Sequence, residues 1–139
     1  MKEKQKRIII DTNLFVSFLI NKDFSKLDKI IIQENAVLIL SSELVNELVE
    51  VISRPKFNKI IAKEDKKTLM DFFTAHGELI EVKTDLSLSR DNKDNFLLEL
   101  AVDGNATHLI TGDQDLLVLK KIKKTKIIQM KSFLSLIRK

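Results

Sequence analysis

The sequence RIIIDTNLFV spans residues 7–16 and places an aspartate, Asp11, directly after three consecutive isoleucines, Ile8–Ile10. A run of β-branched apolar residues is typical of a strand that is buried on both faces of a sheet. A carboxylate at the end of such a strand is costly unless it is paired or binds a metal ion. Asp11 is therefore either a cap of the helix that follows or part of a functional site.

The composition predicts one folded domain over residues 1–139. Hydrophobic residues make up 44% of the chain and charged residues 32%, which is enough apolar material for a core. The chain has no cysteine, and this excludes a disulfide framework, a thiol nucleophile and a zinc–thiolate site. We find neither a signal peptide nor the ~18 apolar residues of a membrane span, and we expect a soluble, cytoplasmic protein without membrane contact.

Short β-branched runs alternate along the chain with segments of helical spacing. Strands are predicted at Ile8–Ile10, Val37–Leu40, Leu79–Val82, His108–Thr111 and Lys126–Gln129. Helices are predicted within 13–33, 43–53, 64–75 and 92–104, and at 133–137. Continuous rather than alternating apolar strands, separated by helices, indicate a parallel sheet covered on both faces. The predicted fold class is α/β, as a three-layer α/β/α domain.

Glycine and proline mark the ends of three predicted helices. Pro55 is expected to end the helix at 43–53. Gly77 and Gly104 each follow a helical segment, where we expect a left-handed glycine.

Acidic residues gather near the predicted strand ends and helix starts. Asp113 follows the strand at 108–111, and ligands of open parallel sheets bind beyond the carboxyl ends of the strands. Taken alone, Asp113 is better explained as the N-cap of the next helix. Further acidic residues are Glu43, Glu47 and Glu50, which share one helical stripe, and Asp91 and Asp94 at the start of the helix at 92–104. Local structure explains each acid separately but not their common location.

Four segments together resemble a PIN domain: 11–13, 42–47, 91–94 and 111–117. More narrowly, they resemble the small stand-alone PIN proteins that form the toxin components of toxin–antitoxin pairs. The resemblance covers residues 7–129 and implies a central parallel sheet of strand order 3-2-1-4-5. It maps the acidic quartet of the family onto Asp11, Glu47, Asp94 and Asp113. Relatives often have a proline where this chain has Asn92, a difference that affects loop stiffness rather than ligands.

This resemblance implies a metal-dependent endoribonuclease that hydrolyses phosphodiester bonds of RNA. Four carboxylates in one pocket repel one another unless cations neutralise them, and all-oxygen ligands suit Mg²⁺ or Mn²⁺. Such ions lower the pKa of bound water and direct hydroxide at a phosphodiester. The quartet therefore supplies both the metal ligands and the catalytic residues. Auxiliary roles fall to Thr12, Asn13, Asp91, Thr111 and Asp115.

The expected partners are the RNA substrate and a small antitoxin protein, and a homodimer is one expected assembly. Residues 101–139 carry eight basic and three acidic side chains. The lysines of this segment that we consider for RNA contact are Lys120, Lys121, Lys123 and Lys124. A basic run of this kind is more often a solvated face than a binding site.

Two other classes of protein stay open. A receiver or phosphatase of the aspartyl-phosphate type also has an aspartate at the end of a parallel strand. The phosphatase pattern needs a second aspartate two residues later, where this chain has Asn13. A PIN-like module that binds RNA or protein without cleavage would be marked by loss of acids from the quartet, and all four are present. The absence of a glycine-rich Lys-Ser/Thr motif argues against a P-loop enzyme.

Overall fold

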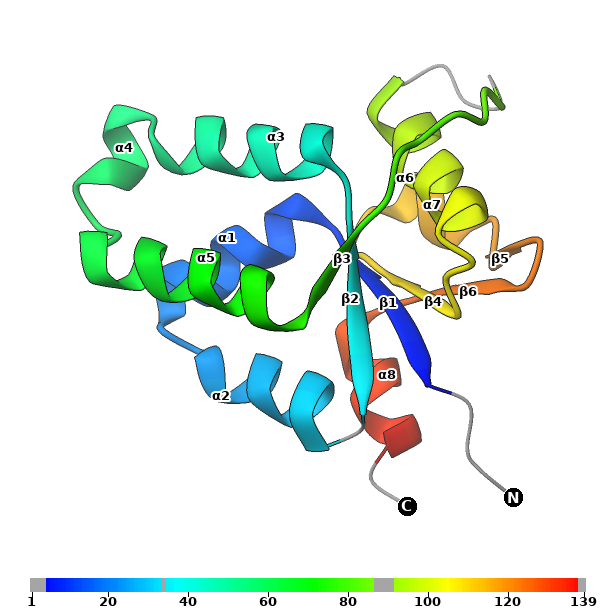
Figure 1. Cartoon of the computed structure of the whole chain (residues 1–139), viewed down its shortest axis with the longest axis horizontal. Helices are drawn as coiled ribbons and strands as arrows, with labels where there is room; N and C mark the ends of the chain where they lie inside the picture. The colour runs from blue at the N-terminus through cyan, green and yellow to red at the C-terminus, as the bar shows by residue number, and fades with distance from the viewer. Residues whose placement is uncertain (1–4, 34, 87–91, 138–139) are drawn as a thin grey trace.

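A computed structural model of the protein describes residues 5–33, 35–86 and 92–137, and a six-stranded sheet lies at its centre (Figure 1). The strand order is β3-β2-β1-β4-β6-β5. The strands are β1 (Lys6–Ile10), β2 (Ala36–Leu40), β3 (Gly77–Leu79), β4 (His108–Ile110), β5 (Lys121–Ile122) and β6 (Thr125–Ile128). All neighbouring strands are parallel except β5, which is antiparallel to β6. The parallel sheet is confirmed, with β6 as the predicted fifth strand and β5 as an unpredicted short edge strand.

Helices cover both faces of this sheet. They are α1 (Thr12–Asn21), α2 (Phe24–Asp28), the π-helix η1 (Lys29–Gln33), α3 (Ser42–Ile52), α4 (Pro55–Asn58), α5 (Lys63–His76), α6 (Asn92–Asp103), α7 (Gln114–Leu117) and α8 (Met130–Ile137). Figure 1 shows α1, α3 and α5 on one side of the sheet, and α6 and α7 on the other. The predicted three-layer arrangement is therefore confirmed. No helix within the described ranges has the length and apolar character needed to cross a membrane.

The core explains why β1 is apolar at consecutive positions. Ile8, Ile9 and Ile10 are each fully buried, because β1 lies between β2 and β4 and has helices over both faces. Burying each of these side chains contributes about 1.5–3 kcal/mol relative to an exposed position. The strand is therefore fixed at the centre of the sheet, and its carboxyl end is fixed with it.

Several predicted boundaries differ from the structure. The helical stretch predicted at 13–33 is divided, because Lys22 takes a left-handed conformation (φ 55°) and ends α1. The helix at 43–53 ends at Ile52, and Pro55 occupies the first position of α4, where its missing N–H costs nothing. Strand β3 begins at Gly77, two residues before the predicted strand, because Gly77 to Leu79 pair with the end of β2.

Residues 80–86 follow β3 as an extended segment that is tied to α6. The carboxylate of Asp103 accepts hydrogen bonds from the backbone N–H groups of Lys83 (2.6 Å) and Thr84 (2.9 Å). Glu99 accepts one from the N–H of Leu86 (2.9 Å). These two acidic residues of α6 therefore accept hydrogen bonds from backbone N–H groups that pair with no strand of the described sheet.

The left-handed conformation predicted for Gly77 and Gly104 is wrong, since no glycine in the described ranges has a positive φ. Gly77 is extended (φ −95°, ψ 152°). What both positions require is space. A Cβ at Gly77 would lie 2.6 Å from the carbonyl oxygen of Phe73, and one at Gly104 would lie 2.6 Å from Cγ2 of Ile39. Glycine is needed here because helix and sheet approach closely, not because of a turn.

Candidate active site

The carboxyl ends of β1 and β4 lie side by side and bring two aspartates to one edge of the sheet. The N–H of Asp11 donates to the carbonyl of Ile110 (3.0 Å). Oδ2 of Asp11 accepts a hydrogen bond from the Thr111 hydroxyl (2.7 Å), and the same hydroxyl oxygen accepts one from the N–H of Asp113 (3.0 Å). Thr111, which is 1% exposed, therefore connects the Asp11 carboxylate to the backbone of Asp113.

Both aspartates also cap helices. Oδ1 of Asp11 accepts from the N–H of Asn13 (3.4 Å) at the start of α1, and Oδ1 of Asp113 accepts from the N–H of Asp115 (2.9 Å) at the start of α7. The capping interpretation of Asp113 is correct. Capping and a site role are compatible, because these bonds fix the orientation of carboxylates that still face the cavity described below.

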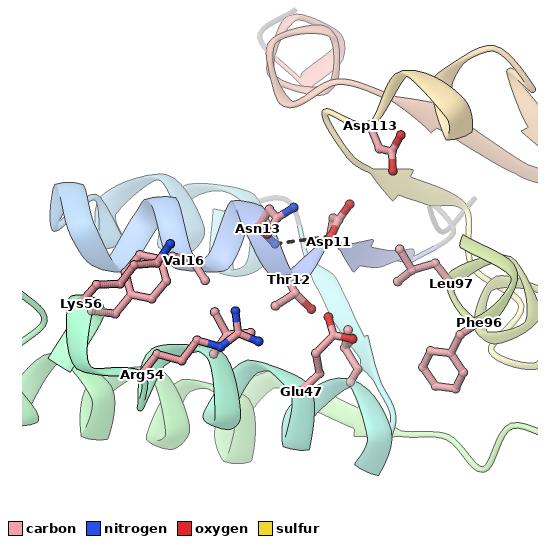
Figure 2. A pocket seen from close by; sticks show the side chains of 13 residues that line it. Asp11, Thr12, Asn13, Val16, Glu47, Arg54, Lys56, Phe96, Leu97 and Asp113 are labelled. Atoms are coloured by element: carbon pink, nitrogen blue, oxygen red, sulfur yellow. Dashed lines mark hydrogen bonds between the residues drawn. The ribbon is translucent and has the colours of Figure 1, made fainter. Parts of the chain in front are cut away.

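A third carboxylate comes from α3. The Ser41 side chain caps this helix by accepting from the N–H of Leu44 (3.0 Å), and α3 then packs against α1 through its buried leucines. Of the acidic stripe on α3, Glu43 and Glu50 are exposed, whereas Glu47 is half-buried. Glu47 is thus the one member of the stripe that the structure turns toward the two aspartates (Figure 2).

Asp11, Glu47 and Asp113 line a single cavity of about 340 Å³ (Figure 2). Thr12 and Asn13 also line this cavity. Thr111 lies beneath it, bonded to Asp11, and Asp115 is exposed on α7 outside the described lining. The structure therefore brings together three of the four predicted site acids.

The carboxylates of this cavity influence one another electrostatically. Burial raises the pKa of Asp11 above its ordinary value, and the nearby charges of Asp113 and Glu47 raise it further. The hydrogen bonds from Thr111 and from the N–H of Asn13 act in the opposite direction, because they stabilise the ionised form. Asp11 is thus a carboxylate held in a site that disfavours its charge.

Residues 7–115 of the chain match the sequence model of the PIN domain. The chain belongs to the PIN-domain family. Members of this family are generally nucleases. An uncharacterized protein of Methanocaldococcus jannaschii, MJ1680, is 29% identical to this chain over 123 residues, which cover 86% of this chain and 79% of the relative.

PIN-domain nucleases generally use divalent metal ions, and the chemistry of this cavity suits them. Asp11, Glu47 and Asp113 offer oxygen ligands, which Mg²⁺ and Mn²⁺ prefer. A cation among them would also relieve the repulsion that raises the pKa of Asp11. Among the described side chains, no three acidic or histidine groups lie close enough together to hold a metal ion.

The third acidic segment of the PIN domain is described only in part. Asp94 belongs to the first turn of α6, but its side chain lies outside the described part of the structure, as does the whole of Asp91. Leu97, one helical turn after position 94, lines the cavity together with Phe96. Helix α6 therefore reaches the site.

Sequence analysis did not single out four further residues of the cavity wall, Arg54, Lys56, Phe57 and Phe96. The seven residues from Glu47 to Arg54 match two helical turns, but α3 ends at Ile52 and Arg54 precedes α4, so this spacing does not place Arg54 at the cavity. The other three carry no local pattern. Their location follows from how the short helix α4 and helix α6 pack.

The lysines considered for RNA contact lie on the β5–β6 hairpin, beyond the range that matches the family. Lys123 and Lys124 form its turn, at the amino end of β6, whereas the cavity lies at the carboxyl ends of β1 and β4. Among the described residues that line the cavity, none belongs to the run at 120–124. Their role in RNA contact stays a prediction.

The ring of His108 packs against Phe133, with centroids 5.1 Å apart. Burial and the nearby charges of Lys126 and Lys6 lower the pKa of His108 to about 4. His108 is therefore a neutral packing residue at neutral pH.

Proposed function

We propose that this PIN domain is a metal-dependent endoribonuclease. One observation carries the proposal: Asp11, Glu47 and Asp113 come from three different elements and line one cavity at the carboxyl ends of neighbouring parallel strands. Converging carboxylates of this kind are unfavourable in the absence of cations. Their retention at one point of the fold supports a site that works with metal ions.

In this proposal Asp11, Glu47, Asp94 and Asp113 hold Mg²⁺ or Mn²⁺. A divalent ion bound in such a site activates water for attack on a phosphodiester. Thr111 holds the Asp11 carboxylate in place and favours its ionised form. Asn13 lines the same cavity, and its side-chain amide provides donors for a phosphate oxygen.

The test is cleavage of a labelled single-stranded RNA with Mg²⁺, with Mn²⁺ and with a chelator, against a DNA of the same sequence. We expect cleavage of RNA that requires metal and is abolished by Asp11→Asn and by Glu47→Gln. Glu43→Gln is the matched control, because Glu43 lies one turn earlier on α3 and is exposed. Cleavage in chelator, or full activity of Asp11→Asn, would contradict the mechanism.

The narrower role, as the toxin of a toxin–antitoxin pair, rests on the resemblance to stand-alone PIN toxins. A small antitoxin protein as partner, and a homodimer as assembly, belong to the same proposal. Expression of the chain with and without the product of the neighbouring reading frame tests it. Growth arrest that the neighbouring product relieves is the expected outcome, and equal growth in both cases would count against a toxin.

A further inference from the structure

The charges that line the cavity are separated in space. The carboxylates of Asp11, Glu47 and Asp113 form one group, and the cationic side chains Arg54 and Lys56 lie to one side of it (Figure 2). Figure 2 also shows Phe96 on the opposite side of Glu47 from this basic pair. The cavity thus offers acids at its centre, cations at one end and an aromatic ring at the other.

The two cations are oriented by neighbours. Nε and Nη2 of Arg54 donate to Glu50, with N···O distances of 3.2–3.3 Å, which leaves Nη1 without an acceptor among the described residues. Nζ of Lys56 lies 4.9 Å from the centroid of the Phe57 ring, and no ion pair involves it within the described chain. Both groups are held at the cavity wall while keeping N–H donors free for a ligand.

The spacing of these groups suits a polyanion rather than one small anion. Helix α3 ends at Ile52, five residues and about 7.5 Å along the helix axis after Glu47, and Arg54 lies beyond that end. Successive phosphates of a stacked nucleic-acid strand rise by only ~3.4 Å each. A strand with one phosphate beside Glu47 therefore presents a different phosphate to Arg54.

The aromatic residues favour a strand with unpaired bases. Phe57 and Phe96 are both half-buried and line the cavity. Unpaired bases stack on such rings, whereas a duplex keeps its bases stacked on one another. We propose that Arg54 and Lys56 form a phosphate-binding rim that holds a single-stranded RNA across the carboxylates, with Phe96 stacking one of its bases. This inference rests on the proposed nuclease function.

Binding is measured by fluorescence anisotropy of a labelled oligouridylate in Mg²⁺ buffer, with every protein carrying Asp11→Asn to prevent cleavage. Each lost phosphate contact lowers the slope of log affinity against log salt by ~0.7 for single strands, so Arg54→Gln with Lys56→Gln should lower it by ~1.4. When the salt concentration rises fourfold, the factor by which this variant loses affinity should therefore be about seven times smaller than the factor for the parent protein. The charge-conserving pair Arg54→Lys with Lys56→Arg should keep the parent slope.

The matched control is Lys63→Gln with Lys67→Gln, which removes the same charge from two exposed residues of α5 that do not line the cavity and should leave the slope unchanged. Phe96→Leu should weaken binding roughly tenfold without changing the slope, because it removes stacking and no charge. Duplex RNA should bind more weakly than the single strand. Thermal melts check that each variant is folded.

An unchanged slope in the Arg54/Lys56 variant overturns the rim, as does a loss of slope that the Lys63/Lys67 variant reproduces. Equal or tighter binding of duplex RNA overturns the single-strand preference. The wild-type cleavage assay separates these outcomes from the proposed function. A protein that binds with the expected pattern but never cleaves contradicts the nuclease, whereas one that cleaves with an unchanged slope in the Arg54/Lys56 variant contradicts the rim.

Discussion

Replacing Thr111 by valine tests how strongly one hydroxyl organises the acidic site. The substitution keeps the shape of a side chain that is 1% exposed, and it removes the hydrogen bond to Asp11 and the acceptor of the Asp113 N–H. A hydrogen bond to a charged group contributes about 1.5–3 kcal/mol and a neutral one about 1 kcal/mol. We therefore expect Thr111→Val to lower the free energy of unfolding by roughly 3 kcal/mol.

Thr125 provides a matched comparison. It is also 1% exposed, and its hydroxyl donates to the neutral carbonyl of Ala106 (2.7 Å). Thr125→Val should cost about 1 kcal/mol, which leaves a difference of roughly 2 kcal/mol between the variants. For a chain of this size that corresponds to a melting temperature about 6 °C lower for Thr111→Val.

The pH dependence of the loss in unfolding free energy shows whether Thr111 acts through the Asp11 carboxylate or only through packing. The Thr111 hydroxyl stabilises the ionised form of Asp11 and so lowers the pKa of that group. Its contribution is present while Asp11 is ionised and is lost as the pH falls through the pKa of Asp11 in the folded protein. The difference in unfolding free energy between Thr111→Val and Thr125→Val should therefore become smaller as the pH falls. Equal destabilisation by Thr111→Val and Thr125→Val at every pH would refute the reasoning.

Three further predictions concern the same site and its surroundings. Because burial raises the pKa of Asp11, its charged form destabilises the metal-free fold, so Asp11→Asn should raise the melting temperature at neutral pH. That gain should vanish as the pH falls through the raised pKa and wild-type Asp11 takes up its proton, and a gain that persists in acid would have another cause. Mn²⁺ at about a hundred times its dissociation constant should stabilise the wild type by ~2.7 kcal/mol in thermal melts. It should stabilise Asp113→Asn less, and equal shifts would show that Asp113 is not a ligand. In urea titrations Gly104→Ala should cost about 1–3 kcal/mol, because its Cβ would overlap Ile39. Gly112→Ala has nothing within 4 Å and a negative φ, so it should be neutral or stabilising by about 0.4–1 kcal/mol, and the reverse order would contradict the packing explanation.

The sequence predicted correctly those elements whose burial can be recognised from the pattern of adjacent residues. Ile8–Ile10 are apolar at every position because both faces of β1 are covered, and this pattern identifies a central parallel strand without any tertiary information. Strand β3 was misplaced because it is an exposed edge strand of three residues whose position is set by pairing with β2. The apolar residues that suggested 79–82 mostly belong to the extended segment that follows β3 instead.

The candidate site also contains residues that a local sequence signal identifies and residues that only the tertiary structure brings to the cavity. Asp11 and Asp113 were identifiable because each follows a β-branched run and precedes a helix, which is a local signal. Helical spacing alone did not separate the glutamates of α3, and Glu47 was selected through the resemblance to the PIN domain; in the structure Glu47 is half-buried and Glu43 is exposed. Arg54 and Lys56 join the cavity through the turn into α4, a tertiary event that no spacing rule encodes.

The pairing of β1 with β4 also decides when the acidic site comes into existence during synthesis. The hydrogen bond from Thr111 to Asp11 joins residues 100 positions apart, and β4 is inserted beside β1, which is made before β2 and β3. Contacts of such sequence separation form late, because the intervening chain must first be closed into a loop. Until β4 has emerged from the ribosome, Asp11 therefore has neither Thr111 nor Asp113 beside it, and the carboxylate pair is assembled only after β1, β2 and β3 have been made.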